Sequence, residues 1–314
     1  MIPADPARLA ELLTAENTRF RHEREQHFRA GETKAALIGE PYFLNGDNGW
    51  GVLLVHGLMA APEEVREWAE ELQRQGYTVY APRLAGHGSS ADDLAARAAE
   101  EWLDSVERGR QILHSAGCRS LVIAGFSTGG ALALVSVIRQ PDAYAAVISI
   151  SAPLRFKSWK ASVAEPVAVW NRLLQRLGVD AWRLEFVHND ADNPHINYGR
   201  CPVHSIVQIR RLMREVRRGL PGIRIPALVM HADADPKVDV RGGREIHRRL
   251  GSAMKRYEEV ACDKHGIVRG EIGRTVFSYG SAFLGAVKRR ADKTVIRERA
   301  GWDHGEIRPF SPAP

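Results

Sequence analysis

Short runs of apolar and β-branched residues recur along the chain, separated by longer stretches with helical periodicity. The apolar runs cover residues 51–57, 77–82, 120–126, 145–153, 226–232 and 255–261. Helical patterns lie between them, near 62–75, 100–115, 128–139, 241–250 and 271–289. Strands that alternate with helices are typical of a mostly parallel sheet covered by helices on both faces, so we predict an α/β fold. Reactive groups in such sheets gather beyond the carboxyl ends of the strands.

The alternation of strands and helices is interrupted once, between Leu154 and about Ile225. This stretch is helical and loop-like in pattern and contains no convincing strand. We interpret it as a cap that is inserted over the active edge of the sheet. The predicted organisation is therefore a core formed by residues 46–153 and 222–292, with an inserted cap over 154–221.

Two terminal segments lie outside this predicted core. Residues 1–45 are expected to contain an amphipathic helix over about 5–30 and a lead-in strand, with a hairpin turned at Asn45–Gly49. The last segment, 293–314, is charged and contains proline, so we expect a loose tail.

Composition places the chain among ordinary soluble proteins, with 44% hydrophobic and 26% charged residues. No apolar run approaches the ~20 residues that span a bilayer, and the N-terminus lacks the pattern of a signal peptide. The three cysteines are widely spaced and odd in number, which fits a reduced compartment better than a disulfide framework or a zinc site. We therefore expect a cytoplasmic protein without stable membrane insertion.

The net charge of +6 comes largely from arginines near 208–218 and from a basic stretch at 288–299. In the first group, apolar residues recur at helical spacing, so the arginines fall on the opposite, solvated face. Contact with an anionic substrate or a membrane surface is the alternative. No RNA-binding motif, zinc-finger spacing or basic-zipper pattern is present, and we expect no nucleic-acid partner.

The stretch "AGFSTGGALAL", residues 124–134, contains a candidate nucleophile. Ser127 directly follows an apolar strand and precedes a helix rich in small residues. A turn this sharp needs residues without bulk on both sides of the serine, which accounts for Gly125 and Gly129. The pattern predicts a serine nucleophile held out at the sheet edge. The alternative is a bend serine that caps the helix.

A serine hydroxyl needs a base, and the base needs an acid to orient it. Asp233, Asp235 and Asp239 follow the predicted strand 226–232, and His265 follows the strand 255–261. The chain order Ser, Asp, His is the one found in α/β-hydrolases. We predict that His265 is the base.

An oxyanion hole needs backbone N–H groups that point to the developing charge. The apolar run 51–57 ends in His56-Gly57 and then turns, so the N–H of Leu58 is a natural first donor. The N–H of Thr128, directly after the serine, is the second. We interpret His56 as a residue that shapes this loop, because His265 fills the role of the base better.

Together, six stretches carry a specific family resemblance: "LLVHGL", "GYTVYAPRLAGHGSS", "EEWLDSVERG", "IAGFSTGGALAL", "HADADPKVD" and "DKHGIV". Over roughly 50–153 and 222–290 the chain resembles α/β-hydrolases of the carboxylesterase and monoacylglycerol lipase group, also described as serine aminopeptidase-like. The resemblance implies the α/β-hydrolase fold. The family's acid usually appears as Gly-x-x-Asp-x-x-Val, which selects Asp235, although Ala232 replaces the glycine and leaves Asp233 as a rival. His87, in "AGHGSS", is interpreted as structural.

The cap lies outside this resemblance and would set substrate choice. Its aromatic residues are Phe156, Trp159, Trp170, Trp182, Phe186 and Tyr198. Such rings either pack against the core or contact an acyl chain, and we name Phe156, Trp159, Trp170 and Trp182 as candidate substrate contacts. The stretch 188–198 contains two histidines and two aspartates, which we interpret as a polar turn rather than a metal site. We expect no metal and no cofactor.

The leading hypothesis is a serine esterase that hydrolyses small-molecule carboxylic esters with short-to-medium acyl chains through an acyl-enzyme. A second hypothesis keeps the same residues but attacks another acyl bond, as an aminopeptidase, amidase or thioesterase. The third is a non-catalytic, ligand-binding member of the fold. We disfavour the third, because such a protein has no need for the serine, acid and histidine together.

Overall fold

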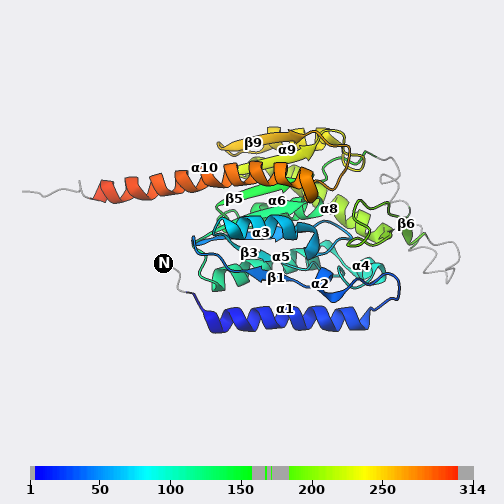
Figure 1. The fold of residues 1–314 in the computed structure, drawn as a ribbon. Coiled ribbons are helices and arrows are strands. Elements are labelled where there is room, and N and C mark those ends of the chain that lie inside the picture. The colour runs from blue at the N-terminus through cyan, green and yellow to red at the C-terminus, as the bar shows by residue number, and fades with distance from the viewer. Residues whose placement is uncertain (1–3, 158–166, 168–170, 172–183, 303–314) are drawn as a thin grey trace, which may run out of the picture.

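A seven-stranded sheet forms the centre of the protein (Figure 1). The computed structural model describes residues 4–302 except 158–166, 168–170 and 172–183. In spatial order, the strands are β1 (Tyr42–Leu44), β3 (Thr78–Ala81), β2 (Trp50–Val55), β4 (Ser120–Phe126), β5 (Ala146–Ile150), β8 (Ala227–Ala232) and β9 (Lys255–Val260). All neighbours pair in parallel except β1 and β3. The predicted mostly parallel sheet is confirmed.

Helices cover both faces of the sheet, so its inner strands are buried over nearly their whole length. One face is covered by α5 (Ala99–Ser115), α6 (Thr128–Arg139), α8 (Val203–Gly219) and α9 (Val240–Arg249). The other is covered by α3 (Arg66–Arg74), which follows the 3₁₀ turn η1 (Pro62–Val65), and by α10 (Gly270–Trp302). Successive residues of β2 alternate between the two layers: Leu53 packs under α5, and Leu54 packs under α3.

The predicted hairpin at Asn45–Gly49 is wrong. β1 pairs antiparallel with β3 rather than with β2, with Tyr42 opposite Ala81. Both edges of β2 are occupied by the parallel partners β3 and β4, so the chain cannot fold back on it. The segment between β1 and β2 is instead tied to the turn before β3, because the N–H groups of Asp47 and Asn48 both donate to the carbonyl of Gly76 over 2.9 Å.

The inserted segment contains strands that the sequence pattern did not predict. β6 (Phe186–His188) and β7 (Arg200–Pro202) form a separate two-stranded antiparallel sheet. Each strand has three residues, too few to show an alternating pattern. The amphipathic helix predicted near 208–218 is present as part of α8, whose apolar side is buried. Its basic side is not only solvated, because Arg217 donates to the carbonyl of Leu154 over 2.7 Å.

The N-terminal segment packs against the core as α1 (Pro6–Gln26) and α2 (Ala36–Gly39) (Figure 1). The side chain of Asp5 caps α1 by accepting the N–H of Arg8, and Phe20 on its inner side is buried. A further short helix, α4 (Ala91–Ala96), precedes α5. At the other end, α10 continues to Trp302 and projects beyond the sheet, so the first part of the segment expected as a loose tail is helical. Residues 303–314 lie outside the described part.

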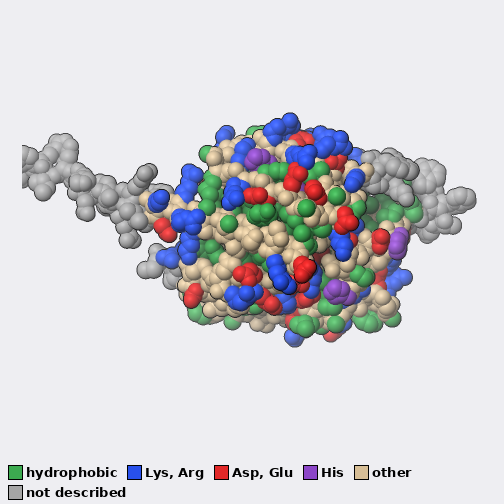
Figure 2. All heavy atoms as spheres, turned by 45° about the horizontal axis from the view of Figure 1, so that its top comes forward, with side chains coloured by type: hydrophobic (Ala, Val, Ile, Leu, Met, Phe, Trp, Pro, Cys, Tyr) green, Lys and Arg blue, Asp and Glu red, His purple; other side chains and the backbone are tan. Residues whose placement is uncertain are grey.

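Basic and acidic side chains are interspersed over the face shown in Figure 2. Many form pairs across elements, such as Arg139 on α6 with Glu215 on α8 at 2.7 Å. Within the described ranges, no helix is both long and apolar enough to cross a membrane. The cysteines Cys118, Cys201 and Cys262 are all free.

Candidate active site

Ser127 occupies a sharp turn between β4 and α6 (Thr128–Arg139). Its backbone has φ 53° and ψ −120°, a conformation that is costly for a residue with a side chain. The turn is held by its N–H, which donates to the carbonyl of Ile150 over 2.8 Å. A Cβ at Gly125 would lie 2.2 Å from the carbonyl oxygen of Gly129, and one at Gly129 would lie 2.2 Å from that of Val55. Both positions therefore require glycine, as the sequence pattern predicts.

The structure brings the three predicted residues together in one chain of contacts. His265 Nε2 lies 2.8 Å from Ser127 Oγ, and His265 Nδ1 lies 2.7 Å from Asp235 Oδ2. They lie in the loops that follow β4, β8 and β9, at the carboxyl edge of the sheet. With its proton on Nδ1, the imidazole donates to the carboxylate and can accept the serine proton on Nε2.

Asp235 is buried and held in place by its own loop. Its Oδ1 accepts the N–H groups of Lys237 and Val238, over 2.8 and 2.9 Å. Burial alone would raise the pKa of Asp235, but the hydrogen bond and charge of His265 and these two amides outweigh it, and the pKa is lowered. The carboxyl is therefore ionised at neutral pH, the state that stabilises a protonated imidazole.

The rival acid Asp233 is exposed, and His265 Nδ1 contacts Asp235 instead. The Oδ1 of Asp233 accepts the N–H of Cys262 over 3.0 Å. Asp239 caps α9 (Val240–Arg249) through the N–H of Arg241. His231, which was not predicted from the sequence, is a buried side chain on β8 whose Nε2 lies 3.6 Å from Asp235 Oδ2. Desolvation lowers the pKa of His231, so its ring is neutral. The negative charge of Asp235 is therefore not neutralised by His231 and can stabilise protonated His265.

The two predicted oxyanion donors line the same cavity as Ser127 and His265. Neither the amide of Leu58 nor that of Thr128 donates a hydrogen bond to any residue that the structure describes. Thr128 is the first residue of α6, where the helix dipole favours negative charge. Both amides are therefore available to a ligand next to the serine.

His56 supports the loop that carries Leu58. Its Nε2 accepts the N–H of Leu84 over 3.2 Å, and its Nδ1 lies 2.9 Å from the carbonyl of Gly57. Complete burial lowers the pKa of His56 to about 4, so the ring is neutral at physiological pH. These contacts support its interpretation as a residue that shapes the loop.

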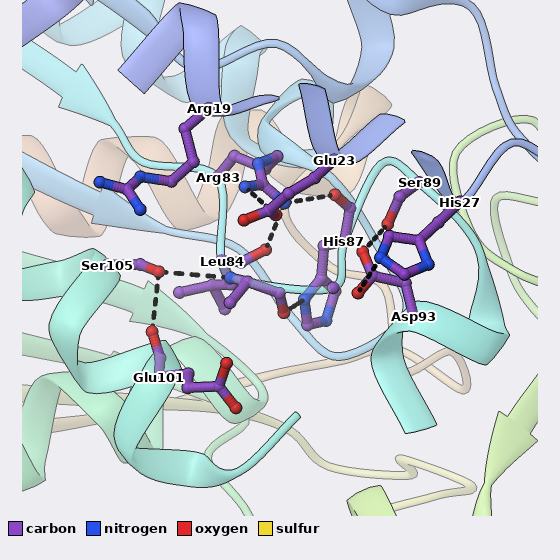
Figure 3. A network of polar contacts seen from close by, with 12 residues as sticks. Arg19, Glu23, His27, Arg83, Leu84, His87, Ser89, Asp93, Glu101 and Ser105 are labelled. Atoms are coloured by element: carbon purple, nitrogen blue, oxygen red, sulfur yellow. Dashed lines mark hydrogen bonds and ion pairs between the residues drawn. The ribbon is translucent and has the colours of Figure 1, made fainter. Parts of the chain in front are cut away.

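The loop after β3 adds a second layer behind His56. The ring of His87 is buried, stacks edge-on against His56 with centroids 5.1 Å apart, and places Nδ1 3.1 Å from the carbonyl of Ala85. Figure 3 shows Arg83 beside it, donating to the carbonyl of His87 over 3.2 Å and to Glu23 of α1 over 2.6 Å. The N-terminal helix thus contributes a charge to the support of the site.

The cavity beside Ser127 has a volume of about 160 Å³. Of the aromatic residues named from sequence, Phe156 lines it. Trp159, Trp170 and Trp182 lie outside the described residues. Tyr198 is buried with its hydroxyl on the carbonyl of Gly86, and Phe186 packs under Arg200, so these two rings serve packing.

The polar stretch 188–198 connects β6 and β7 and reaches the loop of His265. Asp192 Oδ2 accepts the N–H of Gly266 over 2.7 Å. Among the side chains that the structure describes, no group of His, Cys, Asp or Glu is arranged to hold a metal ion.

The chain is similar to known proteins in sequence and in structure. Residues 47–271 match the family described as serine aminopeptidase, S33. A thermostable monoacylglycerol lipase from Bacillus sp. (strain H-257) is 31% identical over 217 residues, which are 69% of this chain and 82% of the relative.

Two solved structures are similar over most of their length. One, from work on the metagenome-derived lipolytic enzymes LipS and LipT, is 25% identical with a TM-score of 0.70, covering 79% of this chain and 98% of that one. A soluble variant of monoglyceride lipase from Saccharomyces cerevisiae, 16% identical with a TM-score of 0.64, covers 79% and 91%. The predicted α/β-hydrolase fold is confirmed.

Proposed function

This chain belongs to the serine aminopeptidase S33 family, and on that premise we propose that it is a serine hydrolase of carboxylic esters. Ser127 is the nucleophile, His265 the general base and Asp235 the acid that orients the base. The observation that carries the proposal is the unbroken chain of contacts from Ser127 Oγ through His265 to Asp235, at 2.8 and 2.7 Å. Among the chain's relatives, the 31% identical one is a monoacylglycerol lipase, which favours esters as the bond attacked.

Hydrolysis proceeds in two steps on these residues. His265 Nε2 accepts the proton of Ser127 as Oγ attacks the ester carbonyl, and it then protonates the leaving alcohol. A water molecule, activated by the same nitrogen, cleaves the acyl-enzyme and releases the acid. Asp235 stays ionised throughout and stabilises the imidazolium, which agrees with its lowered pKa.

The amides of Leu58 and Thr128 form the oxyanion hole of the proposed reaction. Both line the cavity with Ser127, and neither donates to a described residue in the absence of substrate. Each donor is complementary to the charge that develops in the tetrahedral intermediate rather than to the neutral carbonyl.

The acyl group is short to medium in length. The cavity of about 160 Å³ is smaller than the roughly 300–1,000 Å³ of sites that hold drug-sized ligands. Phe156, Ile206 and Ile209 supply apolar lining. A short acyl chain can bury its methylenes there at about 0.8 kcal/mol each.

Replacement of the nucleophile tests the proposal. Ser127→Ala should lose at least ~10³-fold in kcat on p-nitrophenyl butyrate and should no longer react with a fluorophosphonate probe. Wild-type turnover by Ser127→Ala would refute it. A panel of matched esters, amides and thioesters separates ester hydrolysis from the other acyl transfers, since the same triad serves all three.

A further inference from the structure

A buried glutamate lies behind the loop that presents Leu58. Glu64, in η1 (Pro62–Val65), is only 4% exposed. Its Oε2 accepts the N–H of Gly57 over 2.7 Å. None of the proposed catalytic steps uses this carboxyl, although it lines the same cavity as Ser127.

Gly57 lies close to both this carboxyl and the nucleophile. A Cβ at Gly57 would lie 3.1 Å from Glu64 Oε2 and 3.3 Å from the Cβ of Ser127. The peptide that joins Gly57 to Leu58 is the one whose N–H is the proposed oxyanion donor. The Gly57 N–H that Glu64 accepts belongs to the preceding peptide, and the carbonyl oxygen of the Gly57–Leu58 peptide lies 2.9 Å from His56 Nδ1.

We propose that Glu64 is a positioning residue that orients the Leu58 amide toward the oxyanion through its hydrogen bond to the Gly57 N–H. The inference rests on the proposed esterase function. The loop 56–61 has no regular secondary structure of its own to fix its peptide planes. An oxyanion hole stabilises charge only where its donors are held in position before the reaction, so the hydrogen bond from Gly57 acts on the rate of the chemical step.

Charged groups from several elements surround the Glu64 carboxyl. Arg269 before α10, Lys237 after β8 and Asp192 in the β6–β7 connection act on it, while Glu63, its neighbour in η1, pairs with Arg66. Desolvation by burial dominates and raises the pKa of Glu64 to about 7, although the Gly57 hydrogen bond, Arg269 and Lys237 lower it. In either protonation state the carboxyl retains an oxygen that can accept the Gly57 N–H. The proposed role therefore depends on an acceptor at this place, not on its charge.

Two substitutions of similar volume separate these properties. Glu64→Gln keeps an acceptor oxygen and removes the charge, so kcat and KM should stay close to wild type. Glu64→Leu fills the space but leaves the Gly57 N–H without a partner. Its kcat on p-nitrophenyl butyrate should fall about 10- to 100-fold with KM little changed, since removal of a whole oxyanion donor costs ~10²–10³-fold. Glu70→Gln, an exposed residue of α3, is the control for charge.

The affinity for a transition-state analogue distinguishes a misplaced oxyanion donor from a general loss of packing. A trifluoromethyl ketone that adds to Ser127 should bind Glu64→Leu more weakly by the same factor as the loss in kcat/KM. Glu64→Asp withdraws the acceptor by one methylene and should also lower kcat, which provides the test if Glu64→Leu does not fold. Wild-type kcat in Glu64→Leu or Glu64→Asp, or equal damage in Glu64→Gln and Glu64→Leu, would overturn the proposal. Failure of the esterase function itself would already appear in the wild-type protein.

Discussion

The carboxylate of Glu23, on α1, accepts a hydrogen bond over 2.6 Å from the guanidinium of Arg83, in the loop that follows β3 (Figure 3). Arg83 is only 3% exposed and also contacts the carbonyl of His87. The ring of His87 in turn contacts that of His56 edge-on, and His56 Nδ1 lies beside the Gly57 carbonyl. Through these contacts α1, which lies outside the residues 47–271 that match the family, supports the loop that carries the proposed oxyanion donor Leu58.

Loss of Glu23 should therefore destabilise the protein. Glu23→Ala leaves the buried cation of Arg83 with neutral partners among the described residues, namely two backbone carbonyls and the ring of Phe20. Removal of one member of a buried pair costs roughly 3 kcal/mol or more. Denaturant unfolding monitored by circular dichroism measures the loss. Glu11→Ala is the matched control on the same helix, because its pair with Arg8 is exposed and should cost under ~1 kcal/mol. Equal losses in the two variants would contradict this reading of α1.

The choice between the two aspartates is tested by activity. Asp235→Asn keeps the shape of the side chain but cannot stabilise the imidazolium, and its amide favours the wrong tautomer of His265, so kcat should fall about 10⁴-fold. Asp233→Asn, on the exposed neighbour, should stay within a fewfold of wild type. Hydrolysis of p-nitrophenyl butyrate by both variants decides the matter, and a reversed order would assign the acid to Asp233.

Glu64 should make the folded state less stable as the pH rises. Burial raises its pKa from 4.5 to about 7, so between these values the folded protein binds more protons than the unfolded chain. The free energy of unfolding then decreases with increasing pH across this window, by at most about 3 kcal/mol. Glu64→Gln removes the effect.

The difference in stability between wild type and Glu64→Gln, measured at pH 5 and pH 8, isolates this contribution from that of other groups. Buried His56 has the opposite sign, since its pKa is lowered to about 4 and its contribution is lost in acid. Relative to wild type, the free energy of unfolding of Glu64→Gln should be higher at pH 8 than at pH 5. A constant difference would show that Glu64 keeps the same charge at both pH values.

Much of the fold could be predicted from sequence because its inner strands are buried on both faces. A strand such as β4 (Ser120–Phe126) then appears as an unbroken apolar run, and the helix after it begins at Thr128 with small residues. Gly125 and Gly129 marked the turn because close backbone approach excludes any side chain at these places. The strands that precede them indicated Ser127, His265 and a group of three aspartates, and the family pattern then selected Asp235 from that group.

Other features depend on tertiary contacts that leave no local pattern. The partner of β1 was decided by which edge of the sheet was free, not by the turn that follows it. Glu63 and Glu64 are adjacent in the sequence, yet Glu64 is buried against Gly57 whereas Glu63 pairs with Arg66. The charged residues after 292 suggested a loose tail, whereas α10 continues through them to Trp302. In each case the local sequence did not determine the structure, which depends on long-range packing or on the continuation of a helix.

The depth of the acyl pocket can be tested along a series of p-nitrophenyl esters. Each methylene that enters apolar lining should add about 0.8 kcal/mol until the cavity ends, so kcat/KM should rise with chain length and then fall. Ile206→Trp, on α8, should fill part of the cavity and move the break to shorter chains while leaving the acetate ester nearly unaffected. Val207→Trp is the control, because this neighbour is similarly half-buried but does not line the cavity.

The alternative to an apolar pocket is recruitment of anionic substrates by the basic side of α8, which would make kcat/KM depend steeply on ionic strength. A profile that is flat in chain length and steep in salt would replace the apolar pocket with charge recruitment, and would leave the roles of Ser127 and His265 unchanged.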